Sequence, residues 1–193
     1  MSRPAIFLDR DGTINAEADY LGDPADVVIL PGAARGIRLL RDASFCLVVI
    51  SNQSGVARGL FSEDAVKSVN AEVARQLAIE NISIDAFYYC PHLPDGTVEE
   101  YAVVCPCRKP APGMLFQAAL DADIDLAASY TIGDSVRDLA AGRSAGTRTV
   151  LVLTGYGKRS LPDVEADALA DYVAVDLVDA ANWIIADRAS VGA

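Results

Sequence analysis

The sequence predicts an α/β fold in which helices cover both faces of a parallel sheet. Short apolar segments that resemble buried strands alternate along the chain with segments of helical spacing, which is typical of parallel sheets. The run Phe45–Ile50 (FCLVVI) is apolar throughout, as expected for a central strand buried on both faces. No repeat, low-complexity tract or linker interrupts the pattern, so we expect one domain over residues 1–193.

The individual elements follow from local patterns. Ala5–Leu8 is a short apolar run and predicts the first strand. Pro31–Asp42 has a proline near its start and apolar residues at helical spacing, so it predicts a helix. Ser62–Leu77 predicts a second helix, with Ser62 as the N-cap and two acidic residues in the first turn. The remaining predicted elements are strands at 84–89, 127–132, 149–153 and 172–175 and helices at 112–120, 135–142 and 177–188.

The composition disfavours several classes of partner. The chain has 193 residues, 52% of them hydrophobic, and a net charge of −11, which indicates an ordered, acidic globule. Nucleic acids and anionic membranes would be repelled by this charge, so we expect neither as a partner. No run of about 18 apolar residues and no signal-peptide pattern is present, which favours a cytoplasmic protein. The acidic surface also favours a monomer.

Polar residues directly follow four of the predicted strands. Asp9, Ser51, Cys90 and Asp134 each stand at such a position. Ligands of open parallel sheets bind beyond the carboxyl ends of the strands, where these residues are expected to meet. The sequence therefore predicts a functional site at this edge of the sheet.

The segment Asp9–Thr13 (DRDGT) places two carboxylates two residues apart. A divalent cation would relieve their mutual repulsion, and a hard oxygen site suits Mg²⁺, which also bridges to phosphate. One carboxylate can then attack phosphorus while the other transfers a proton. A simple turn is the competing interpretation, and a calcium loop is a weaker one because the third ligand and the terminal Glu of an EF-hand are missing.

Four residues of the segment 90–107, called here the cysteine loop, predict a structural zinc site. Cys90 and His92 form one close pair and Cys105 and Cys107 another, and three thiolates with one imidazole make a closed tetrahedral set. A Cys105–Cys107 disulfide and ordinary core cysteines are the alternatives. His92 is the only histidine, which argues against a Ser-His-Asp or Cys-His hydrolase. Cys46 lies inside an apolar run and is expected in the core.

Read together, these motifs resemble the haloacid dehalogenase (HAD) superfamily of phosphohydrolases. That family has DxDGT after the first strand, Ser or Thr after the second, a later Lys and an acidic Gly-Asp loop, which are matched by Asp9–Thr13, Ser51, Lys109 and Gly133–Asp134. The resemblance implies a Rossmann-like sheet and an aspartyl-phosphate on Asp9. It also implies the following roles: Asp11 as acid and base, Ser51 and Lys109 on the phosphoryl oxygens, and Asp9, the backbone carbonyl of Asp11, and Asp134 as ligands of Mg²⁺.

Within the superfamily, the sequence most resembles the D-glycero-D-manno-heptose 1,7-bisphosphate 7-phosphatases. The match includes FLDRDGTIN (7–15), SNQSGVARG (51–59), YCPH (89–92) and CRKPAPGM (107–114). This resemblance implies a small phosphosugar substrate. Little chain is left between the motifs for a large cap domain, so we expect an open site. Candidate substrate contacts are Asp19 and Tyr20 in a flap at 15–32, the donors Asn52, Gln53 and Ser54, and Arg108 for a second anionic group.

Three alternatives remain open at the level of sequence. Histidinol-phosphate phosphatases share the same motif set but have a shorter zinc loop. Phospho-acceptor signalling domains also place acidic loops on a parallel sheet, and Asp11 is the residue that argues for hydrolysis instead. A zinc-stabilised binding module without catalysis is disfavoured by the intact Asp9, Asp11, Lys109 and Asp134. Asp138 is interpreted as a helper that orients a ligand, or as an acid in the first turn of a helix.

Overall fold

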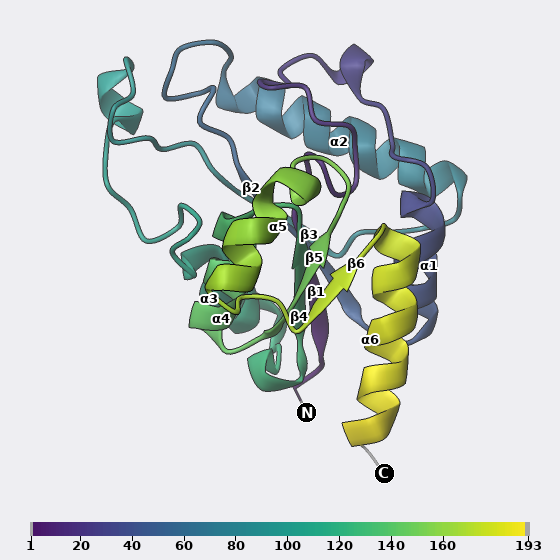
Figure 1. Ribbon diagram of the computed structural model, residues 1–193. Coiled ribbons are helices and arrows are strands. Elements are labelled where there is room, and N and C mark those ends of the chain that lie inside the picture. The colour runs from purple at the N-terminus through teal and green to yellow at the C-terminus, as the bar shows by residue number, and fades with distance from the viewer. Residues whose placement is uncertain (1, 192–193) are drawn as a thin grey trace.

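A parallel sheet lies at the centre of the computed structural model, which describes residues 2–191 (Figure 1). Its strands are β1 (Ala5–Leu8), β2 (Cys46–Asn52), β3 (Ala86–Cys90), β4 (Tyr130–Gly133), β5 (Arg148–Val152) and β6 (Tyr172–Ala174). They are ordered β3-β2-β1-β4-β5-β6, and every neighbouring pair is parallel. The predicted fold class is confirmed.

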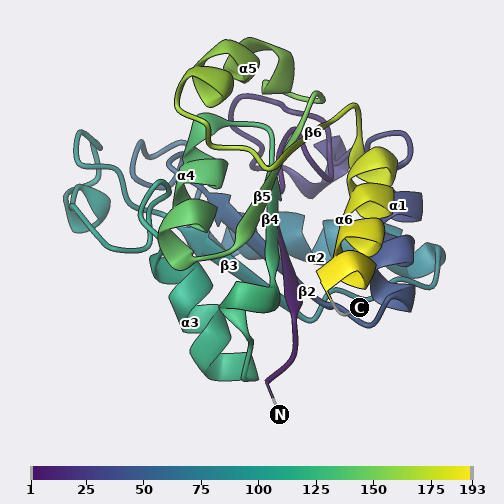
Figure 2. The ribbon, with the colours of Figure 1, turned by 60° about the horizontal axis from the view of Figure 1, so that its bottom comes forward.

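Helices pack on both faces of this sheet (Figure 2). They are α1 (Ala33–Asp42), α2 (Glu63–Ile79), α3 (Gly113–Ala122), α4 (Val136–Ala145), α5 (Gly157–Ala166) and α6 (Leu177–Val191), with short 3₁₀ helices η1 (Pro24–Asp26), η2 (Glu99–Tyr101) and η3 (Leu126–Ala128). One hydrophobic cluster joins α1, α2 and α6 to the sheet, and a second joins α3 and α4 to its other face. A third cluster packs α5 against α4 and β5.

The strand order brings the carboxyl ends of β1 and β4 together. Leu8 is paired with Ile132, so the residues that follow each strand emerge side by side. Connections leave these two strands toward opposite faces, which opens a crevice at their ends. The sheet itself therefore brings the loops that carry Asp9 and Asp134 together.

One local prediction was wrong and one helix was missed. Residues 127–129 are not part of a strand, because the side chain of Asp125 accepts hydrogen bonds from the backbone of Ala127 and Ala128 and caps η3 instead. Helix α5 was not predicted, since it contains Pro162, a residue that normally interrupts a helical pattern.

The connection between β3 and α3 spans residues 91–112 and contains η2 as its only helix. The described residues thus include no large cap domain. None of the helices in the range 2–191 is long and apolar enough to cross a membrane. That residues 1–193 form one domain stays a prediction, because residues 1, 192 and 193 lie outside the described residues.

Candidate active site

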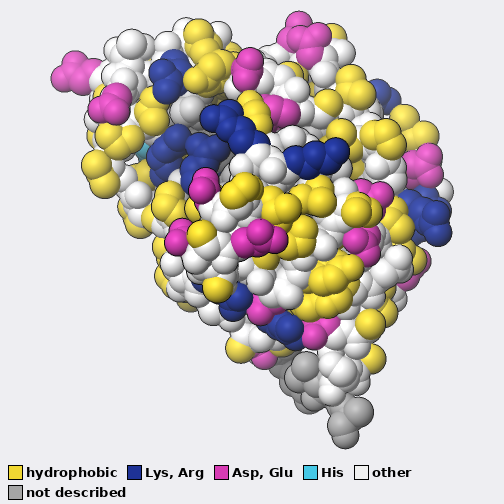
Figure 3. Space-filling model, viewed as in Figure 1, with side chains coloured by type: hydrophobic (Ala, Val, Ile, Leu, Met, Phe, Trp, Pro, Cys, Tyr) yellow, Lys and Arg dark blue, Asp and Glu magenta, His cyan; other side chains and the backbone are white. Residues whose placement is uncertain are grey.

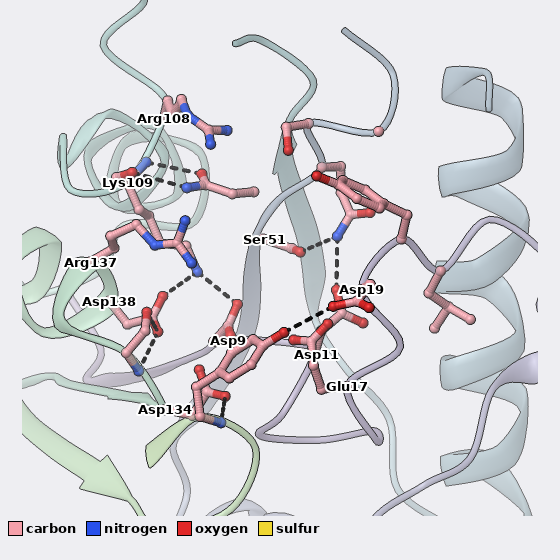
Figure 4. Close-up of a pocket in the computed structure, with 18 of the residues that line it drawn as sticks. Asp9, Asp11, Glu17, Asp19, Ser51, Arg108, Lys109, Asp134, Arg137 and Asp138 are labelled. Atoms are coloured by element: carbon pink, nitrogen blue, oxygen red, sulfur yellow. Dashed lines mark hydrogen bonds and ion pairs between the residues drawn. The ribbon is translucent and has the colours of Figure 1, made fainter. Parts of the chain in front are cut away.

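A polar cavity of about 230 Å³ opens at the carboxyl edge of the sheet (Figure 4). Every catalytic and substrate-binding residue predicted from the sequence lines it: Asp9, Asp11, Asp19, Tyr20, Ser51, Asn52, Gln53, Ser54, Arg108, Lys109 and Asp134. These residues come from four loops and the flap at 15–32, which shows that the motifs converge in space.

The turn after β1 fixes the position of Asp9. The backbone N–H of Asp9 donates to the carbonyl of Ile132 at 2.9 Å, which continues the contact with β4 one residue beyond the end of β1. Gly12 then adopts a φ of +79°, and a Cβ atom there would lie 2.0 Å from Oδ2 of Asp134. The DRDGT turn and the acidic loop are thus in such close contact that only glycine fits between them.

Lys109 reaches into the floor of the cavity and is only 3% exposed. Its Nζ contacts Oδ1 of Asp9 at 2.7 Å and Oδ1 of Asp138 at 2.6 Å, and donates to the carbonyl of Ile50 at 2.9 Å. The side chain of Asn52 holds the backbone of Lys109 by accepting from its N–H and donating to its carbonyl. Burial alone would lower the pKa of Lys109, but the charges of Asp138 and Asp9 outweigh it and raise that pKa.

Three buried carboxylates offer a site for a hard cation. Oxygen atoms of Asp9, Asp134 and Asp138 lie within 4.8 Å of one another. Burial, followed by the negative charge of Asp138, raises the pKa of Asp9 well above its usual value and that of Asp134 to about 7. One ammonium group cannot neutralise three carboxylates, so the donor set fits Mg²⁺.

Asp134 and Asp138 have different surroundings. Oδ2 of Asp134 accepts from the backbone N–H of Tyr156 at 2.7 Å. Oδ2 of Asp138 accepts from the N–H of Ser135 at 3.0 Å, and this makes a capping box at the start of α4. Asp138 thus contacts Lys109 and lies in the first turn of α4, and the second of these placements is one of the two expected from the sequence.

The carboxylate of Asp11 lies outside the acidic cluster. Its oxygens accept from Arg10, from Nδ2 of Asn15 at 2.8 Å and from Nε2 of Gln53 at 3.0 Å. Nε2 of Gln53 also donates to Oγ of Ser51 at 2.6 Å. Both oxygens of Asp11 are thus held by donors, which fixes the carboxylate at the wall of the cavity.

Donor atoms of Cys90, His92, Cys105 and Cys107 also lie within 4.8 Å of one another, although the four residues come from both ends of the cysteine loop. The Sγ atoms are 3.0 to 3.4 Å apart, and Nδ1 of His92 is 3.4 Å from Sγ of Cys107. These separations approach the about 3.8 Å expected between tetrahedral thiolates around zinc. Cys46 is buried in the core, as predicted.

Two arginine residues line the cavity near Lys109. Figure 3 shows basic side chains gathered around a hollow, and Figure 4 shows Arg108 and Arg137 beside Lys109. Burial lowers the pKa of Arg108, and the nearby charge of Arg137 lowers it further. Two arginines that repel each other in a cavity indicate a place for an anion.

Sequence reasoning missed Arg137, Glu17 and Tyr156, all of which line the cavity. Arg137 had one detectable signal, because a cation in the first turn of a helix opposes the helix dipole. Tyr156 belongs to a loop for which no element was predicted. The flap does border the cavity, where the hydroxyl of Tyr156 contacts Asp19 at 3.2 Å and Arg58 lies over the ring of Tyr20.

Comparisons with known proteins agree with this geometry. The family model described as HAD-hydrolase-like matches residues 106–180. D-glycero-beta-D-manno-heptose-1,7-bisphosphate 7-phosphatase from Escherichia coli K12 is 45% identical over 178 residues, which cover 92% of each chain. The corresponding protein from Yersinia pestis is 42% identical over 92% of this chain and 93% of its own length. The chain belongs to this phosphatase family.

Solved structures of family members share the architecture of this phosphatase. D,D-heptose 1,7-bisphosphate phosphatase from B. bronchiseptica, crystallised with magnesium and phosphate, has a TM-score of 0.83 and 36% identity over 95% of this chain and 99% of its own. The enzyme from Burkholderia thailandensis has a TM-score of 0.68 and 33% identity over 93% of this chain and 96% of its own. The resemblance inferred from the motifs is therefore confirmed.

Proposed function

We propose that the protein is a magnesium-dependent phosphatase that removes the 7-phosphate of D-glycero-D-manno-heptose 1,7-bisphosphate. The observation that carries this proposal is the placement of Lys109, whose ammonium group joins Asp9 to Asp138 in a cavity that also contains Asp11 and Ser51. Phosphoryl transfer depends on such positioning and charge compensation. The high identity to heptose bisphosphate phosphatases over nearly the whole chain supports the choice of substrate.

Two half-reactions account for hydrolysis. A carboxylate oxygen of Asp9 attacks phosphorus and the bond between phosphorus and the sugar oxygen breaks, while Asp11 donates a proton to that oxygen. Water then attacks the phosphorus of the aspartyl-phosphate and Asp11 takes up its proton, which releases phosphate and restores Asp9. Ser51 and Lys109 donate hydrogen bonds to the phosphoryl oxygens in both steps.

The acidic cluster is the proposed site of Mg²⁺. Asp9, Asp134 and the backbone carbonyl of Asp11 would hold the ion, and Asp138 would hold Lys109 beside it. When bound, the ion neutralises charge on the phosphoryl oxygens. The raised pKa values of Asp9 and Asp134 support this assignment, because a cation is what keeps such carboxylates ionised at neutral pH.

The second phosphate of the substrate is proposed to bind Arg108 and Arg137. Both guanidinium groups face the cavity on the side away from Asp11 (Figure 4). A guanidinium matches phosphate geometry in a bidentate manner. This pair favours a bisphosphate over histidinol phosphate, whose organic part carries a positive charge.

The cysteine loop is proposed to bind a structural zinc ion through Cys90, His92, Cys105 and Cys107. The ion would fix Arg108, which follows Cys107 directly and donates from Nη1 to the carbonyl of His92 at 3.0 Å. Its four ligands leave no open position, so it would not take part in the chemistry. Metal analysis of protein purified without chelator should find about one zinc per chain.

A phosphate-release assay tests the substrate assignment. We expect hydrolysis of heptose 1,7-bisphosphate to exceed that of histidinol phosphate and of p-nitrophenyl phosphate. Hydrogen bonds to charged groups contribute about 1.5–3 kcal/mol, so R137A should reduce kcat/KM for the bisphosphate about 10- to 100-fold. R35A, at an exposed position on α1, is the matched control. If R137A lost kcat/KM equally for the bisphosphate and for p-nitrophenyl phosphate, the proposed role of Arg137 would be contradicted.

A further inference from the structure

Arg10 is an arginine with no exposed surface, and it lies beside the cavity without lining it. Its guanidinium makes a two-pronged contact with Asp11, from Nε to Oδ1 at 3.1 Å and from Nη2 to Oδ2 at 3.0 Å. A buried positive charge is costly unless a carboxylate compensates for it. Among residues 2–191, Arg10 forms its ion pair with Asp11.

The third nitrogen of this guanidinium is held from a distant element. Nη1 of Arg10 donates to Oδ1 of Asn70 at 2.8 Å. Asn70 lies on α2, is only 7% exposed, and stands on the buried side of the helix among residues that are otherwise all apolar. A polar residue is unfavourable at such a position unless it has a hydrogen-bond partner, and Arg10 supplies that partner.

The two contacts differ in what they fix. The adjacent Arg10 sets the plane of the Asp11 carboxylate, because both of its oxygens are held at once. Asn70 fixes the guanidinium itself, since α2 is anchored in the core of the protein by Val69 and Val73. Hydrogen bonds thus connect Asn70 on the buried face of α2, through Arg10, to the carboxylate of Asp11.

We infer that Arg10 is a positioning residue for Asp11 and that Asn70 of α2 fixes Arg10 in turn. This inference rests on the proposed role of Asp11 in proton transfer to the leaving sugar oxygen. A proton donor must lie within hydrogen-bond reach of that oxygen, and a displacement of about 1 Å can cost about 100-fold in rate. Asn70 does not touch the substrate and acts only through Arg10.

The test compares two leaving groups in the variant Asn70→Ala. A sugar alkoxide needs a proton as it departs, whereas p-nitrophenolate leaves without one, and kcat/KM reports on this first transfer. We expect kcat/KM for heptose bisphosphate to fall about tenfold, with little change for p-nitrophenyl phosphate. Gln76→Ala is the matched control, because Gln76 is also an amide on α2 and donates to Val27 and Glu72 away from the cavity.

A purely structural role for Asn70 gives a different result. In that case Asn70→Ala would lower the melting temperature. It would also reduce kcat/KM equally for both substrates, or for neither, and the inference would be overturned. Asn70→Ser carries the same comparison if the alanine variant does not fold, since its shorter side chain does not reach Nη1 of Arg10 while its hydroxyl remains polar. If the wild type failed to hydrolyse either ester, the proposed function would fail instead, so the two failures are distinguishable.

Discussion

Replacing Lys109 with Met removes the one ammonium group that contacts the acidic cluster among the described residues, and it preserves much of the side-chain length. Lys109 is 3% exposed and pairs with Asp9 at 2.7 Å and Asp138 at 2.6 Å. Removing one partner of a buried ion pair costs about 3–5 kcal/mol. Each kcal/mol lowers the melting temperature of a domain of this size by about 2–4 °C, which gives an expected loss of about 6–20 °C. Phosphate release should fall at least about 100-fold.

Thermal unfolding in metal-free buffer measures this loss, with K67M as the control. Lys67 pairs with Asp64 on the surface and is 62% exposed, so its replacement should leave melting temperature and activity unchanged. The loss caused by K109M should also shrink as the pH falls, because protonation removes the negative charge that Lys109 compensates. A K109M protein that melts like the wild type at neutral pH would refute the reasoning.

Three further predictions concern Asp134. The pKa of Asp134 is raised to about 7 in the folded protein, from about 3.8 in the unfolded chain. Protonation of Asp134 therefore contributes most to stability below about pH 3.8, and this contribution is lost as the pH rises through about 7. Metal-free protein should therefore melt at a higher temperature at about pH 5 than at about pH 8, and Mg²⁺ affinity measured by calorimetry should weaken as protons compete at low pH. A Cβ at Gly155 would lie 2.1 Å from Oδ2 of Asp134, so G155A should weaken Mg²⁺ binding. G146A shares the positive φ but meets no atom within 4 Å, so it should lower only the melting temperature, and equal Mg²⁺ affinities in the two variants would contradict the prediction.

Much of the fold could be predicted because the strands are continuous apolar runs. All four residues of β1 are buried, as are six of the seven in β2, and both were evident in the sequence. The missed helix α5 begins at a glycine and contains Pro162, so its local propensity contradicts its structure. It forms because Val164 packs against the buried side chains of Leu139 and Leu151, a tertiary effect that no local pattern contains.

The candidate site was predictable at residues whose side-chain chemistry and position after a strand both indicate a function. Asp9 and Asp134 follow strands that lie side by side, so their convergence follows from the topology. The hydrogen bond from Arg10 to Asn70 was not predictable, since the two residues are 60 positions apart and the side chain of Asn70 is buried on a helix. Arg137 was missed although a helix was predicted to begin beside it, because the sequence does not show which side chains of the first turn line the cavity.

Trapping of the covalent intermediate tests the central claim most directly. The enzyme is mixed briefly with substrate labelled in the reacting phosphate, quenched in acid and digested, and the labelled peptide is sequenced by mass spectrometry. We predict that the label is on Asp9 and is absent from D9N, while D9N retains the fold and zinc content of the wild type. Label on another residue, or phosphate release by D9N at the wild-type rate, would contradict the account.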